Sequence, residues 1–152
     1  MKAEYVNPVF KAVTDVFKAM LDIEVSRGAT GAVAGGSQGV DIRINVTGDV
    51  SGSILFQFPQ DTTLNIVQIM SGMELKELDD FVTSAMGEIS NIISGNAASY
   101  LSKLNYRCDI MPPQIAVADA VVSAHFSHET LSIPLHTNIG DMNICISLNE
   151  MK

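Results

Sequence analysis

Apolar residues recur at helical spacing in three stretches of the chain. These stretches are Asn7–Glu24, Asp61–Ser71 and Glu74–Leu104. In the first, Pro8 suits an opening turn and Asn7 can cap it. In the second, Asp61 or Thr62 is the expected cap. The third is expected to start near Glu77–Asp80, because acidic side chains stabilise a helix N-terminus.

Strand patterns occupy the segments between these helices. Asp41–Val46 and Ser51–Phe58 alternate polar and apolar residues around Thr47-Gly48-Asp49, which predicts a β-hairpin. The glycine-rich Arg27–Val40 predicts one short strand and a mobile turn, and the apolar Ile115–Ala124 is ambiguous. Further strands are predicted at Tyr106–Met111, Thr130–Thr137 and Met142–Leu148. This order predicts an α+β fold, a mainly antiparallel sheet with helices packed on it, in a single domain over residues 1–152.

The composition narrows the class of protein. With 47% hydrophobic and 17% charged residues, the chain is expected to fold into a compact structure. The net charge of −8 argues against binding to nucleic acid or to an anionic membrane surface. The chain has no apolar run near the ~20 residues that span a bilayer, and its first residues lack the pattern of a secretion signal. We therefore expect a cytoplasmic protein.

The most informative segment lies in the third predicted helix. Ser84, Glu88 and Asn91 stand at positions i, i+4 and i+7, which fall within roughly 60° of one another on a helix. Gly87 and Gly95 flank this row, although glycine is a poor helix former. A polar row about 10 Å long beside two glycines is suited to contact with another molecule.

The run Ser-x3-Glu-x2-Asn, with Pro113 after twenty-one intervening residues, resembles the active-site signature of the CheC/CheX/FliY chemotaxis phosphatases. The local string Gly-Glu-Ile-x-Asn-Ile-Ile-x-Gly and the Tyr-Val-Asn-Pro that leads into the first helix strengthen the resemblance. Proteins of this family dephosphorylate the response regulator CheY. The resemblance therefore implies a CheC/CheX-like fold and hydrolysis of an aspartyl phosphate in two-component signalling.

The resemblance also implies roles for individual residues. Asn91 would orient the attacking water, since a carboxamide offers both a donor and an acceptor without acting as a base. Glu88 would anchor the partner by pairing with the active-site lysine of its receiver domain. Ser84, Gly87 and Gly95 are expected at the contact surface, where Gly87 either admits the partner or packs against another helix. The Mg²⁺ ion is expected in the receiver's own site, with no cofactor or metal held by this chain.

One helix carries the signature, because in Asn7–Glu24 Asp15 is followed three residues later by Lys18. CheC and FliY carry two such helices, so the chain resembles the CheX branch, whose members form homodimers through their sheets. The alternative function is a non-catalytic module of the same fold that binds a receiver or a flagellar switch component.

Other patterns are weaker. The glycine-rich segment Gly28–Gly39 lacks the Gly-Lys-Ser/Thr ending of a phosphate loop, so a hairpin turn is preferred to a nucleotide site. This segment is also the sole basis for a third function, a small-ligand sensor. His125 and His128 could bind a metal, but no third ligand is evident. Cys108 and Cys145 are predicted to be buried, reduced thiols in strands.

Overall fold

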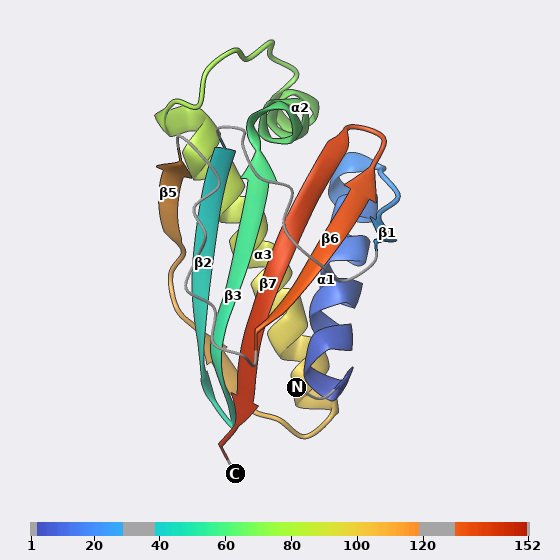
Figure 1. Ribbon diagram of the computed structural model, residues 1–152, viewed down its shortest axis with the longest axis vertical. Helices are drawn as coiled ribbons and strands as arrows, with labels where there is room; N and C mark the ends of the chain where they lie inside the picture. Colours follow the sequence, from blue (N-terminus) through green and yellow to red (C-terminus); the bar gives the residue numbers. More distant parts are fainter. Residues whose placement is uncertain (1–2, 29–38, 119–129, 152) are drawn as a thin grey trace.

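A computed structural model describes residues 3–28, 39–118 and 130–151 of the chain. Within these ranges there are three helices and seven strands (Figure 1). The helices are α1 (Ala3–Leu21), α2 (Gln60–Ser71) and α3 (Asp80–Lys103). The strands are β1 (Ser26–Arg27), β2 (Gly39–Gly48), β3 (Val50–Pro59), β4 (Cys108–Ile110), β5 (Gln114–Ala118), β6 (Leu131–Thr137) and β7 (Gly140–Glu150).

The strands form one open, antiparallel sheet in the order β1-β6-β7-β3-β2, with β4 and β5 paired in succession to the outer side of β2. The predicted hairpin is confirmed as β2–β3, in which Ile44 pairs with Ile54 and Ile42 with Phe56. These residues are buried, whereas Arg43 between them is exposed, so the alternation of the sequence gives the sheet one apolar face.

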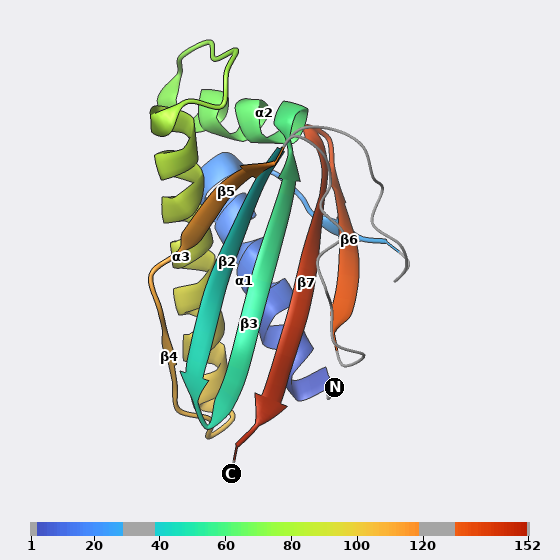
Figure 2. The ribbon, with the colours of Figure 1, turned by 60° about the vertical axis from the view of Figure 1, so that its left-hand side comes forward.

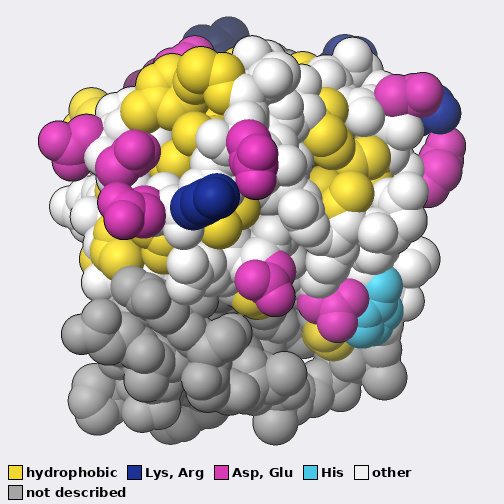
Figure 3. Space-filling model, turned by 90° about the horizontal axis from the view of Figure 1, so that it is seen from above, with side chains coloured by type: hydrophobic (Ala, Val, Ile, Leu, Met, Phe, Trp, Pro, Cys, Tyr) yellow, Lys and Arg dark blue, Asp and Glu magenta, His cyan; other side chains and the backbone are white. Residues whose placement is uncertain are grey.

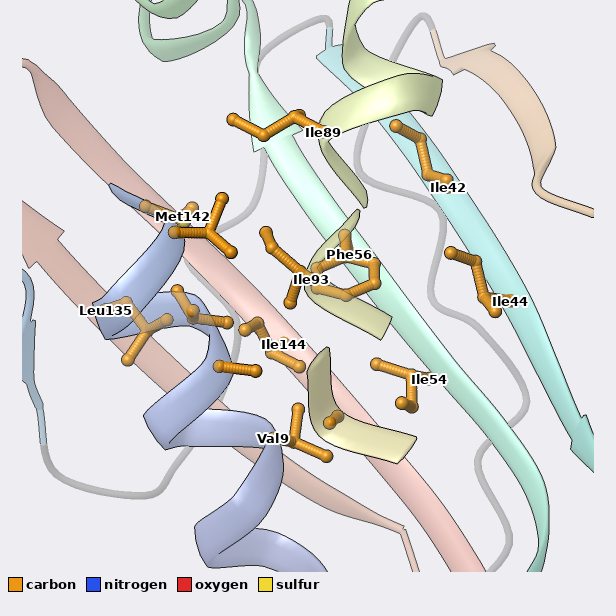
Figure 4. Packing of buried hydrophobic residues seen from close by; sticks show 14 of the residues in the cluster. Val9, Ile42, Ile44, Ile54, Phe56, Ile89, Ile93, Leu135, Met142 and Ile144 are labelled. Atoms are coloured by element: carbon orange, nitrogen blue, oxygen red, sulfur yellow. The ribbon is translucent and has the colours of Figure 1, made fainter. Parts of the chain in front are cut away.

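That apolar face is covered by α1 and α3, while α2 crosses one end of the molecule (Figures 1 and 2). Ile93 of α3 lies over Phe56 of the sheet, and Ile89 of α3, Ile144 of the sheet and Val9 of α1 belong to the same buried cluster (Figure 4). All five are buried, and burial of each such side chain contributes about 1.5–3 kcal/mol. The predicted fold class, an antiparallel sheet with helices packed on it, is confirmed.

The first helix begins earlier than predicted. It starts at Ala3 and contains Pro8, so the prediction that Asn7 caps it is wrong. Tyr5 and Val6 are almost completely buried, and their packing favours extending the helix ahead of the proline. Tertiary burial here outweighs the local preference for proline in a first turn.

The predicted caps of the second helix are also wrong, because its N-cap is Pro59 and makes no side-chain hydrogen bond. The Thr62 hydroxyl instead donates to the carbonyl oxygen of Asp141 at 2.7 Å, which ties α2 to the start of β7. The predicted end is correct: Gly72 follows the helix in the left-handed conformation, with φ of 73°.

The remaining strands largely match the predictions. Strand β1 starts one residue before the predicted segment, β4 is shorter than Tyr106–Met111, and β5 occupies the start of the ambiguous stretch. Most of the glycine-rich segment and both His125 and His128 lie outside the described residues.

The two cysteines lie in strands and neither forms a disulfide. Cys145 is buried as predicted, and burial raises the pKa of its thiol to about 11. Cys108 is only half-buried, so the prediction of a buried thiol is wrong at this position. The strand that contains it is a short edge strand, paired with β2 alone among the described strands.

Candidate functional site

Helix α3 presents one buried face and one accessible face. The Asp79 side chain caps the helix by accepting a hydrogen bond from the Val82 backbone N–H at 3.0 Å. Met86, Ile89 and Ile93 are fully buried against the sheet. Their spacing leaves the opposite side of the helix free of core packing.

The predicted site residues lie on that opposite side. Ser84 and Glu88 are exposed and Asn91 is half-buried, so all three can be reached from solvent. At 3.6 residues per turn they share one strip of the surface, which we call the polar ridge. The carboxylate and the carboxamide therefore project together, away from the core, as the sequence spacing predicts.

The functional groups of the polar ridge are unpaired within the part of the chain that the structure describes. None of the hydrogen bonds or ion pairs among these residues involves the side chain of Ser84, Glu88 or Asn91. In water an exposed carboxylate and carboxamide keep their hydrogen-bonding capacity for an incoming partner. The ridge is thus chemically available.

Helix α1 differs at the comparable surface. Lys11 pairs with Asp15 at 2.9 Å and Lys18 pairs with Asp22 at 3.0 Å. Hydrogen bonds from Tyr100 and then Lys11 lower the pKa of the Asp15 carboxyl. These polar side chains at α1 are therefore already paired, unlike those of the polar ridge.

Gly87 lies beside the polar ridge and is buried. A β-carbon at this position would be 2.6 Å from Ile115 Cδ1 and 3.8 Å from Pro113 Cγ. The missing side chain therefore leaves room for the start of β5 beside α3. Gly87 packs against this segment of the same chain and not against another helix, which was one of the two alternatives predicted. This packing also places Pro113, distant in sequence, against Gly87, which stands one helical turn before Asn91.

Gly95 has open space around it. A β-carbon there would meet only Ile110 Cδ1 at 3.9 Å, which is ordinary van der Waals contact. Its position one turn after Asn91 continues the polar ridge toward the C-terminal half of α3. A role for Gly87 or Gly95 in partner binding stays a prediction.

The model of the family described as chemotaxis phosphatase CheX matches residues 40–136. The chain belongs to this family. It is 32% identical over 122 residues to the CheY-P phosphatase CheX of Thermotoga maritima, an alignment that covers 76% of each chain. The family resemblance, and with it the prediction of a phosphatase, is confirmed.

Solved structures of the family share the fold. The chemotaxis protein CheX of Vibrio vulnificus is 25% identical and superposes with a TM-score of 0.87 over 97% of this chain and 100% of that one. A second structure is the complex of CheX with CheY, BeF3 and Mg²⁺ from Borrelia burgdorferi. Its matched chain is 24% identical, with a TM-score of 0.80 over 96% of this chain and 98% of that one.

Among the described residues, no group of three or more His, Cys, Asp or Glu side chains could hold a metal ion. No helix in the same part of the chain is long and apolar enough to cross a bilayer.

Two apolar residues near the polar ridge were not predicted from the sequence. Phe81 and Ile115 are large hydrophobic side chains with 48% and 39% of their surface exposed. Phe81 stands three residues before Ser84, so its helical spacing could have indicated it. No sequence signal could indicate Ile115, because its contact with Gly87 depends on the tertiary fold.

Proposed function

We propose that this chain accelerates hydrolysis of the aspartyl phosphate on a CheY-type response regulator. The observation that carries the proposal is the free carboxylate and carboxamide that share one exposed face of α3. Family membership and the Thermotoga relative support the substrate class. The Borrelia complex supports the partner, since it contains CheX together with CheY, BeF3 and Mg²⁺.

In this proposal Asn91 positions the attacking water. An aspartyl phosphate is an acyl phosphate and already reactive, so catalysis needs a water held in line with phosphorus more than it needs a base. The Asn91 carboxamide can accept a hydrogen bond from the water while its N–H donates to a second oxygen. Half-burial of Asn91 limits its rotation, which favours one orientation of the amide.

Glu88 anchors the partner. It is exposed and about one turn before Asn91, so its carboxylate can reach a lysine at the rim of the receiver's phosphorylation site. Such a pair fixes the register in which the polar ridge enters that site. Ser84, Gly87 and Gly95 contribute to the contact surface, and Mg²⁺ is supplied by the receiver.

We also propose that the chain acts in the cytoplasm, where its receiver partner is phosphorylated, and that it forms a homodimer through its sheet. Helix α3 lies on one side of the sheet (Figure 2), and its polar ridge faces away from the sheet, so pairing through the sheet would leave the ridge accessible. Light scattering is expected to give about twice the chain mass of 16.3 kDa. A mass of one chain at micromolar concentration would reject the dimer.

The decisive experiment follows phosphate loss from a phosphorylated CheY-type receiver in the presence of the protein. Asn91→Ala should lower the acceleration by about 100-fold or more while receiver binding is retained. Asn96→Ala is the matched control, a half-buried asparagine on another side of the same helix, and should keep full activity. Wild-type rates in Asn91→Ala would reject the mechanism.

A further inference from the structure

Phe81 lies in line with the polar ridge. Its position on α3 falls within about 80° of Ser84, Glu88 and Asn91, and it precedes Ser84 by about one turn. Nearly half of its surface, 48%, is exposed. An exposed phenylalanine leaves a large apolar area in water, which burial in a partner surface would remove.

Ile115 borders the other flank of the same ridge. It covers Gly87, which is displaced by about 40° from Asn91 around the helix. Ile115 pairs with the buried Ile42, so it faces the helical side of the sheet, where β5 runs beside the first half of α3 (Figure 2). Its 39% exposure shows that α3 does not cover it completely.

The surface around Phe81 is strongly acidic. The loop that leads into α3, together with the first residue of the helix, carries four exposed carboxylates and one exposed lysine. These are Glu74, Glu77, Asp79, Asp80 and Lys76. From this end of the molecule, hydrophobic side chains are seen lying among acidic ones (Figure 3). A partner with lysine or arginine at its rim would be attracted to such a surface.

We propose that Phe81 and Ile115 are the apolar anchors that select the receiver partner, on either side of the residues that act on its phosphate. The inference rests on the proposed function and adds specificity to it. Exposed aromatic and aliphatic side chains next to a polar contact are typical of the few residues that dominate an interface. The receiver surface beside the phosphorylated aspartate is accordingly apolar at its centre, with basic residues outside.

Phe81→Ala tests the proposal in the full chain. Its affinity is measured for a CheY-type receiver loaded with BeF3⁻ and Mg²⁺, alongside the KM and kcat of dephosphorylation. The dissociation constant and KM should each rise about tenfold, with kcat nearly unchanged, because Phe81 touches no reacting atom. Leu104→Ala is the matched control, since Leu104 follows the other end of α3 and is 46% exposed.

Ile115→Ala should also weaken binding by several-fold, and thermal unfolding shows whether β5 stays in place in that variant. Affinities within twofold of wild type for Phe81→Ala, or equal losses in Leu104→Ala, would overturn the proposal. The proposed function is judged separately by Asn91→Ala. If Asn91→Ala loses catalysis while Phe81→Ala binds normally, the proposed mechanism is supported and the proposal of apolar anchors is rejected.

Discussion

Gly87 lies directly beneath Ile115, and a β-carbon there would be 2.6 Å from Ile115 Cδ1. Glycine in the interior of a helix usually costs about 1 kcal/mol relative to alanine. Close approach of β5 to α3 accounts for a glycine at this position.

The two glycines of α3 should therefore respond differently to alanine. Gly95→Ala should raise the free energy of unfolding by about 0.5–1 kcal/mol, because its β-carbon meets only ordinary contact. In Gly87→Ala the gain should be smaller, because the Cδ1 methyl of Ile115 must turn aside. Urea unfolding of both variants measures the difference. An equal gain in the two would show that Ile115 does not press on the helix.

Charge reversal at Glu88 should weaken docking. Glu88→Lys places a cation where the receiver lysine is expected, so the dissociation constant for the BeF3⁻-loaded receiver should rise tenfold or more. Glu88→Gln should bind more weakly than wild type and lose part of the salt dependence. Asp109→Lys makes the same charge change on β4 and is the control. If both lysine variants bind alike, Glu88 is no specific anchor.

Replacing Ser90 should stabilise the protein. The hydroxyls of Ser90 and Ser94 are buried and find no hydrogen-bond partner among the described residues. Ser90→Ala removes an unsatisfied group and favours the helix, so the free energy of unfolding should increase by about 1–2 kcal/mol. Ser99 is exposed and donates to the Gly95 carbonyl at 3.2 Å, so Ser99→Ala should change stability by only a few tenths. Destabilisation of Ser90→Ala would contradict the prediction.

Tyr106 should make the fold sensitive to alkali. Its hydroxyl donates to Glu4 Oε2 at 2.8 Å, and this bond, followed by burial, raises the pKa of Tyr106 to about 12. As the pH rises from about 10 toward 12, the unfolded chain releases this proton before the folded one, so stability falls. In Tyr106→Phe the fall should be shallower, as measured by urea midpoints from pH 8 to 11.5. Cys145 titrates in both proteins, so the difference between them reports Tyr106.

The fold was predictable where periodicity and tertiary burial agree. The alternation of polar and apolar residues predicted the β2–β3 hairpin, and the helical spacing of apolar residues predicted α3 with its polar ridge. The start of α1 was predicted too late in the sequence, because burial of Tyr5 favours a helix that begins before Pro8. The cap of α2 was missed because Thr62 bonds across the fold to Asp141. Each error occurs where a distant contact outweighs a local preference.

The residues of the candidate site likewise include some that the sequence predicts and some that depend on distant contacts. Ser84, Glu88 and Asn91 lie on one helix, so their spacing alone predicts that they share a face. Pro113 and Ile115 reach that face through pairing of β5 with β2, which cannot be read from their own sequence. Both Ile115 and Val117 are exposed, so the apolar run that contains them did not distinguish a core strand from an edge strand.

The phenol of Tyr5 donates to Glu150 Oε2 at 2.7 Å, which holds the last strand to the first helix. Both ends of the described fold lie at the pole away from the start of α3 (Figure 1). A tether fused after β7 would therefore attach the molecule to a sensor chip by the pole opposite the start of α3, which keeps that end of the helix away from the chip surface. Immobilised in this way, the protein can report receiver capture without a label on either partner.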